Sequence, residues 1–156
     1  MYQGNNSIAI QSQAFITQAL LDLMKEKNFT KIQIKELCEK AQVSRQTFYS
    51  LYDSKEQILE LYFDHIFKEF KTSLETKETL SLSIICSSAI TYFVNNSDFI
   101  ELLVNNQLDH IFNRKLEQYL LDFSKEANVA KLHDQEYAIA FLAGALTGII
   151  RKYIEN

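Results

Sequence analysis

A run of side chains able to donate hydrogen bonds follows Ser44, a residue type that begins helices well. Its members are Arg45, Gln46, Thr47, Tyr49 and Ser50, and Lys55 follows a few positions later. Arginine and glutamine can reach base edges, while hydroxyl and ammonium groups bind phosphate oxygens. Free backbone N–H groups at a helix start attract phosphate as well. The chemistry in this segment is therefore hydrogen bonding to a polyanion.

Residues that usually carry catalysis are scattered through the chain. His65, His110 and His133 are far apart, and no Glu precedes a His by three residues, which excludes the di-iron bundle pattern. No HExxH, P-loop, GxSxG or CxxC motif occurs. We predict that the protein is not an enzyme and holds neither a metal nor a cofactor.

The two cysteines and the lengths of the apolar runs indicate the cellular compartment in which the protein works. Cys38 and Cys86 lie 48 residues apart in apolar helical patterns, which favours small core residues in a reducing compartment over a disulfide or a zinc pair. The longest nearly uncharged apolar run, residues 137–150, has 14 residues and is shorter than the roughly 20 that span a bilayer. No secretory leader pattern precedes it. We expect a cytoplasmic protein without a membrane partner.

Composition predicts an all-α protein. The 156 residues are 47% apolar and 23% charged, which excludes disorder, and they include three glycines and no proline, which leaves few turn residues for a β-fold. The formal charge of −4 argues against a general nucleic-acid coat protein, and the acidic excess lies after residue 60. Residues 28–55 hold five basic and three acidic side chains, so this stretch is the part suited to a polyanion.

Apolar spacing predicts two short helices around the polar run. Residues at i, i+3, i+4 and i+7 from Ile34 to Ala41 form a two-turn helix, which needs tertiary packing to persist. Ser44 begins the second helix, in which Phe48 and Leu51 point inward. A helix over residues 7–27 precedes the pair. We therefore predict a helix-turn-helix at about residues 33–51, whose second helix fits the roughly 12 Å major groove.

The rest of the chain is predicted to be a helical bundle. Ser54 and Gln57 form a capping-box pattern at the start of a connector helix that runs to about Leu74. Further helices are expected over residues 79–95, from Ser97 or Asp98, through residues 111–123, and from about 134 to 154. We expect a head at residues 8–56 and a body at residues 57–156.

Residues 28–59 resemble the DNA-binding head of the TetR family of bacterial transcriptional regulators. The features that carry the resemblance are the spacing of Ile34, Leu37, Cys38 and Ala41, then Val43-Ser44-Arg45, Thr47-Phe48-Tyr49, Tyr52, Ser54-Lys55-Glu56 and Leu59. With the preceding helix the match covers about residues 8–60. The body is similar only through its helical pattern and an apolar terminal helix ending at residues 148–153.

Two positions depart from the family pattern. Gln42 stands where the family usually has glycine in the turn, so we expect a non-glycine residue at positive φ, at a cost of roughly 1 kcal/mol. Gln33, a poor N-cap, stands where serine or threonine often begins the first helix of the motif. Thr30 with Gln33 offers an alternative capping box, stapled by Phe29 and Ile34, that would begin this helix earlier.

The resemblance implies a sequence-specific regulator that binds a double-stranded operator as a homodimer, with repression as the expected direction. The DNA-binding residues expected are Gln33, Lys35, Ser44, Arg45, Gln46, Thr47, Tyr49, Ser50 and Lys55. The alternative is a TetR-like helical co-regulator that acts through a protein partner, and the net-neutral head and acidic body favour it. Steep salt dependence of DNA binding would separate the two.

Small residues recur every fourth position in the last helix. Since glycine in a helix costs up to about 1 kcal/mol, two glycines one turn apart indicate that another backbone approaches closely. The expected dimer contacts are Ala140, Gly144, Ala145 and Gly148. The alternative is that this helix, apolar almost all round, is fully buried at the centre of one subunit.

The resemblance also implies that the body senses a small-molecule effector. About a hundred residues of body leave room for a small cavity at most. The candidate lining residues are Cys86, Tyr92, Phe93, Phe99, Leu103, His110 and Tyr119. All are ordinary core residue types, so the sequence does not identify the effector.

Overall fold

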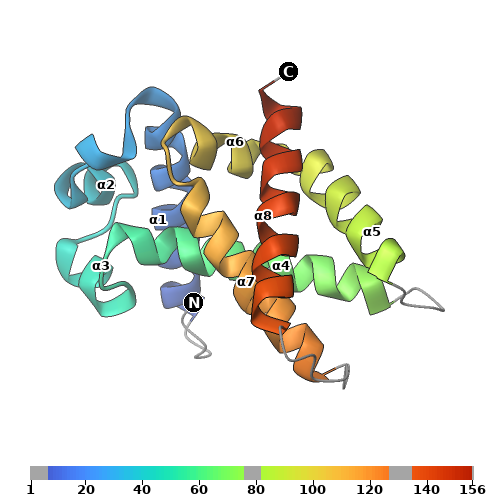
Figure 1. Cartoon of the computed structure of the whole chain (residues 1–156). Coiled ribbons are helices and arrows are strands. Elements are labelled where there is room, and N and C mark those ends of the chain that lie inside the picture. The colour runs from blue at the N-terminus through green and yellow to red at the C-terminus, as the bar shows by residue number, and fades with distance from the viewer. Residues whose placement is uncertain (1–6, 76–81, 127–134, 156) are drawn as a thin grey trace. The chain divides into compact units, whose positions relative to one another are not determined.

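The computed structural model describes residues 7–75, 82–126 and 135–155, and these residues form helices without any strand, as predicted (Figure 1). The elements are α1 (Ser7–Glu26), the 3-10 turn η1 (Phe29–Lys31), α2 (Ile34–Lys40), α3 (Arg45–Leu51), α4 (Lys55–Glu75), α5 (Leu82–Asn95), α6 (Ser97–Asn105), α7 (Asp109–Glu126) and α8 (Gln135–Ile154). The predicted helix starts at residues 79 and 134 lie outside the described residues.

The chain divides into two compact units, and the boundary falls inside α4, between Ile66 and Phe67. The predicted domains divide ten residues earlier, after residue 56. The first three turns of α4 belong to the first unit because they carry Ile58, Leu59 and Phe63, which are all at most 1% exposed. We call the units the head and the body.

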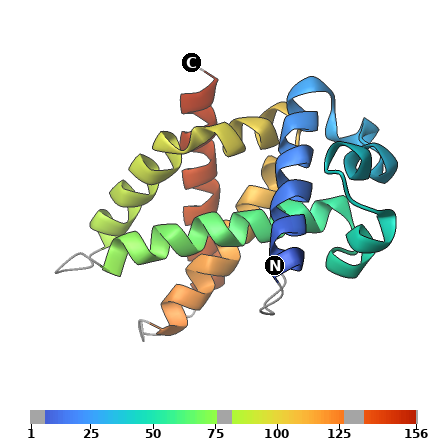
Figure 2. The same cartoon turned by 180° about the vertical axis from the view of Figure 1, so that it is seen from behind.

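In the head, α1 packs against both α2 and α3, and α2 packs against α3, an arrangement visible from behind in Figure 2. Ile16 and Leu20 of α1, Leu37 of α2 and Phe48 of α3 are completely buried. The two-turn helices α2 and α3 are too short to persist alone, so burial of Leu37 and Phe48 holds them in place. The head core thus fixes which face of α3 is left outside.

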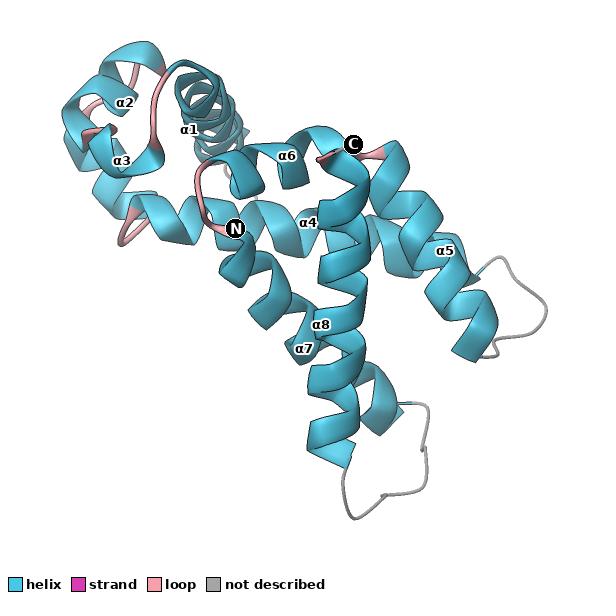
Figure 3. Ribbon diagram, turned by 45° about the horizontal axis from the view of Figure 1, so that its top comes forward, coloured by secondary structure: helices cyan, strands magenta, loops and turns pink. Residues whose placement is uncertain are grey.

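In the body, α8 packs against α5, α6 and α7 (Figure 3). Thr147 Oγ1 donates a hydrogen bond to Asn113 Oδ1 at 3.1 Å, and Arg151 pairs with Asp109 of α7 at 3.2 Å. Phe93 and Phe112 are each 1% exposed, and their rings meet edge to face with centroids 5.4 Å apart. The body therefore has its own aromatic core.

Candidate functional site

The turn between α2 and α3 has the geometry of a Schellman motif. Val43 N–H donates to Cys38 O at 3.0 Å, and Gln42 N–H donates to Glu39 O at 3.2 Å. This pattern places Gln42 in the left-handed region, and its φ is 55°. The expected positive φ at a non-glycine residue is confirmed. The turn therefore keeps the shape that glycine would favour, at a conformational cost.

Three hydroxyl groups build the start of α3. Ser44 Oγ accepts from Thr47 N–H at 2.9 Å and lies 2.8 Å from Thr47 Oγ1, while Ser50 Oγ donates to Thr47 O at 2.7 Å. Ser44 is therefore the N-cap that the sequence predicts. Ser44 and Ser50 are exposed and Thr47 is half-buried. Their hydroxyls already hold the helix start in shape.

The remaining polar side chains of α3 face outward. Arg45 and Gln46 are exposed, and Tyr49 is 58% exposed. Among the described residues, Arg45, Gln46 and the Tyr49 hydroxyl form no hydrogen bond or ion pair. The helix thus presents a guanidinium, an amide and a phenol on one side, with their donors available to a ligand.

The opposite side of α3 is anchored by two aromatic residues. Phe48 is completely buried, and Tyr52, immediately after the helix, is 2% exposed. Their ring centroids lie 5.9 Å apart, and the Tyr52 hydroxyl lies 3.4 Å from Thr17 Oγ1 of α1. Burial raises the pKa of the Tyr52 phenol, so this group is neutral at physiological pH. The predicted inward position of Phe48 is confirmed, and Leu51 is half-buried.

Lys55 does not occupy the place expected of a phosphate ligand. Its Nζ donates to Phe29 O at 2.6 Å and to Ile32 O at 2.9 Å, and it lies 4.3 Å from the centroid of the Phe29 ring. Burial lowers the pKa of this half-buried amine. The sequence places Lys55 at a helix start but does not reveal carbonyls from 23 and 26 residues away. Lys55 instead ties the start of α4 to the segment that leads into α2.

The structure also shows where the first helix of the motif begins, for which the sequence left two possibilities. Gln33 is the N-cap and makes no side-chain cap bond. Thr30 does not cap α2, because its N–H and hydroxyl both donate to Asn28 Oδ1, at 2.9 and 2.6 Å. The earlier start through a Thr30–Gln33 capping box is therefore wrong, and a 3-10 turn occupies those residues. Gln33 stays exposed at the helix start.

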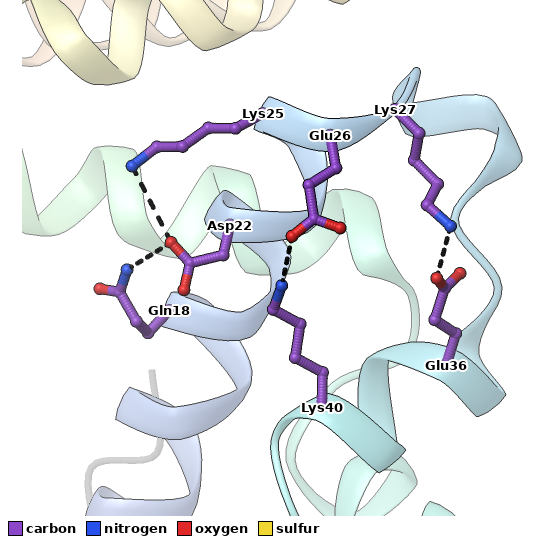
Figure 4. Close-up of polar contacts among 7 residues, drawn as sticks. All are labelled: Gln18, Asp22, Lys25, Glu26, Lys27, Glu36 and Lys40. Carbon is purple, nitrogen blue, oxygen red and sulfur yellow. Dashed lines mark hydrogen bonds and ion pairs between the residues drawn. The ribbon is translucent and has the colours of Figure 1, made fainter.

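Ion pairs between α1 and the α2 region use several of the head's basic residues (Figure 4). Lys27 pairs with Glu36 at 2.5 Å and Lys40 pairs with Glu26 at 2.7 Å. The hydrogen bond from Lys40 to Glu26 raises the pKa of the lysine. Pairs that solvent reaches, as it does here, stabilise by only about 0 to 1 kcal/mol, so their main effect is to position α2 against α1.

The exposed cations of the motif differ in whether they have a partner. Lys35 is exposed and lies 3.8 Å from Glu39. Arg45 of α3 and Lys31 of η1 have no carboxylate within 4 Å among the described residues. The sequence pattern predicts Arg45 as a DNA-binding residue but does not indicate Lys31. Lys31 is recognised only once the other lysines of the motif are seen to be occupied.

Comparison with known protein families shows which family the head resembles. Residues 16–62 match the family described as bacterial regulatory proteins, tetR family. The chain therefore carries the DNA-binding domain of the TetR family at its head. It is a DNA-binding transcriptional regulator whose helix-turn-helix consists of α2, the turn at Gln42 and α3.

Solved structures share the fold of this chain. The crystal structure of Lin0861 from Listeria innocua aligns with a TM-score of 0.87 and 19% identity, covering 100% of this chain and 85% of the other. The dihydroxyacetone kinase operon activator DhaS aligns with a TM-score of 0.56 and 21% identity, covering 92% of this chain and 84% of the other. No curated protein matches the sequence.

The side of α8 that carries the small residues is open. Ala140, Gly144, Ala145 and Gly148 are all exposed, and a Cβ added at either glycine would meet nothing within 4 Å. Large apolar neighbours are exposed as well, with Tyr137 at 78%, Phe141 at 74%, Tyr153 at 61% and Ile149 at 48%. The alternative of a helix fully buried within one subunit is therefore wrong.

The residues of α8 from Glu136 to Ile154 are long and apolar enough to cross a membrane, judged by length and composition alone. This window is longer than the 14-residue run noted in the sequence because it includes charged residues at its ends. Ala143 and Ile150, on the other side of the helix, are completely buried in the body. One apolar side is thus covered and the other is not.

A cavity of about 160 Å³ opens in the body, but it is mostly not where the sequence analysis expected it. Its lining is Phe67, Phe70, Lys71, Leu74, Ile85, Tyr119, Leu120 and Asp122. Tyr119 is the one expected residue among them. Of the others expected, Phe93, Phe99 and Leu103 are buried, Cys86 and Tyr92 are half-buried, and His110 is exposed. The expected lining differs because α4, which the sequence suggested was only a connector, supplies half of the residues around the cavity.

Proposed function

We propose that this TetR-family regulator binds a specific operator directly through α3. The observation that carries the proposal is the set of free donors on Arg45, Gln46 and Tyr49, on a helix whose other face is fixed by buried Phe48. Arginine and glutamine read guanine and adenine edges in the major groove, and tyrosine binds phosphate. A rigidly anchored helix holds these groups in one register on the duplex. Exposed Gln33 and Lys35 beside it would add phosphate contacts, whereas the hydroxyls of Ser44 and Ser50 already form hydrogen bonds within α3.

The regulator acts as a homodimer, with the exposed side of α8 as the contact between subunits. The four small residues there allow two helices to approach closely, while Tyr137, Phe141 and Ile149 supply apolar area. A two-fold interface uses the same patch on both subunits, which suits a continuous stripe on one helix. Dimerisation gives two copies of α3, as an operator with two half-sites requires. It also explains an apolar helix without invoking a membrane.

The regulator works as an effector-responsive repressor in the cytoplasm. The supporting feature is the body cavity, four of whose lining residues lie on α4, the helix that begins in the head at Lys55. A ligand that binds these residues differently in two conformations shifts the population of the DNA-binding form. The structural relative DhaS is described as an activator, so the direction of regulation needs a transcription reporter. Repression predicts increased transcription when the gene is deleted.

A co-regulator that acts through a protein partner is the second candidate. The observation that favours it is that Lys40 is paired with Glu26, Lys35 lies near Glu39, and Lys55 binds backbone carbonyls. The head thus has fewer free cations than its composition indicates.

A salt titration of DNA binding separates the two candidates. A dimer that neutralises Z phosphates loses affinity with a slope of about −0.9Z in log K against log[salt]. Direct operator binding predicts a steep slope for the wild type and a shallower one for Lys31→Ala. Lys68→Ala, which removes an exposed lysine of the body, is the matched control. A flat slope, or DNA binding that appears only with a cell extract, would favour the co-regulator.

A further inference from the structure

We propose that the body cavity binds a neutral ligand consisting of a single aromatic ring with at most a small substituent. The cavity lies entirely within the body, between the last turns of α4, the start of α5 and the middle of α7. The proposal rests on the effector-responsive function above for its biological meaning. Its physical basis is the size, the lining and the charge of the cavity.

Size limits the ligand. The cavity volume is about 160 Å³. An apolar protein cavity of roughly 150 Å³ accepts a benzene molecule. One ring with a methyl, hydroxyl or similar group therefore fills the space, and a fused polycyclic compound or a long acyl chain exceeds it.

The shape of the lining favours an aromatic ring over an aliphatic one. Phe67 and Tyr119 stack with centroids 3.7 Å apart and planes 9° apart, and Phe70 meets Phe67 edge to face at 5.7 Å. Phe67, Phe70 and Tyr119 all line the cavity. Aromatic rings gain about two- to tenfold in affinity from offset-stacked or edge-to-face contacts beyond the effect of their buried area. A saturated ring of the same volume gains only the burial.

Charge excludes ionic ligands. Leu74, Ile85 and Leu120 complete the apolar lining, and the two charged lining residues are Lys71 and Asp122, which carry opposite charges and are both exposed. An ion of either sign meets no net opposite charge there and would lose hydration in an apolar space. Water also finds few hydrogen-bond partners in such a cavity, so an apolar ligand displaces little bound solvent.

The test is a titration of the full-length protein with toluene, methylcyclohexane and benzoate, followed by two-dimensional NMR. Toluene is expected to bind saturably, with a Kd below about 1 mM. Methylcyclohexane should bind about two- to tenfold more weakly, and benzoate at least about tenfold more weakly. Equal binding of toluene and methylcyclohexane, or a preference for benzoate, would overturn the proposed ligand class.

Filling variants locate the site. Ile85→Phe places a ring in the cavity and should weaken toluene binding by about tenfold or more. Ile90→Phe is the matched control, since Ile90 lies on the same helix, is also half-buried, and does not line the cavity. Leu120→Phe fills the cavity from α7 and serves if Ile85→Phe does not fold. Undiminished toluene binding by a folded filling variant would contradict the assignment.

Operator binding measured without toluene or the other test ligands separates failure of this proposal from failure of the proposed function. If the protein binds its operator but not toluene, the cavity assignment fails and direct DNA binding stands. If toluene binds as expected but no operator is found, the regulator proposal fails and the ligand site stands.

Discussion

The exposed sides of α3 and α8 differ in chemistry, although both helices are anchored by a completely buried apolar side. Beyond buried Phe48, α3 exposes Arg45, Gln46 and Tyr49, whereas beyond buried Ile150, α8 exposes Phe141 and a row of small residues. Burial of one side explains why each helix is held in place. The other side indicates the partner, which is a polyanion for α3 and a second apolar helix for α8.

The largest expected effect is at α8. Gly144→Leu should weaken the dimer by about 2 kcal/mol or more, because the added side chain separates two closely packed helices. The isolated subunit should gain up to about 1 kcal/mol, since leucine favours a helix and the space beside Gly144 is open within the chain. Sedimentation and urea unfolding measure the two effects.

A matched control for that change is Gln118→Leu, on an exposed position of α7. It should leave the dimer intact. An unchanged dimer in Gly144→Leu would show that the exposed side of α8 is not the interface. The exposed apolar side of α8 would then not indicate a partner subunit.

The next effect is at α3. Arg45→Ala should cost roughly 1 to 3 kcal/mol at the base that Arg45 contacts and relax selectivity at that position. Lys31→Ala removes the same charge from η1 and should weaken binding to all sequences alike. Competition with operator variants measures both. Equal and sequence-independent losses for the two variants would indicate that Arg45 binds only phosphate.

An effect of about 1 to 2 kcal/mol is expected at Lys55, now on the stability of the head and not on its contact with DNA. Lys55→Met keeps the aliphatic stem but removes both hydrogen bonds to the carbonyls of Phe29 and Ile32. Urea unfolding should show the loss, while the salt slope of operator binding stays unchanged. Lys68→Met on the same helix is the control. A salt slope reduced by about one unit would restore the phosphate role.

The smallest effect is at the turn. Gln42→Gly should stabilise the head by about 1 kcal/mol, because glycine adopts the φ of 55° without steric cost. Gln42→Ala retains that cost and should show no gain. Urea unfolding compares the two variants. A destabilised Gln42→Gly would mean that the glutamine side chain makes a contribution larger than the backbone strain.

Much of the head could be predicted because its signals are local. The spacing from Ile34 to Ala41 and the N-cap at Ser44 each involve residues within two helical turns, so the sequence alone places α2 and α3. The positive φ at Gln42 was predictable through the family resemblance, because Gln42 stands where the family usually has glycine. Outward and inward positions on α3 then follow from helical periodicity.

Features that depend on distant segments could not be predicted. The two carbonyls that bind Lys55 lie more than 20 residues away, and nothing in the local pattern indicates them. The cavity combines Phe67 and Leu74 with Ile85 and Tyr119, from three helices. Since all are common core residue types, only the packing shows which of them leave space.

Selection of bound fragments from the source genome with the purified protein tests whether paired copies of α3 read a duplex. We expect enrichment of a motif with two-fold symmetry, whose half-sites are spaced by one helical turn of DNA or a multiple of it. We also expect that Arg45→Ala loses preference at one position in each half-site. Fragments retained without a shared motif, or with a motif unaffected by Arg45→Ala, would contradict reading of the duplex by α3.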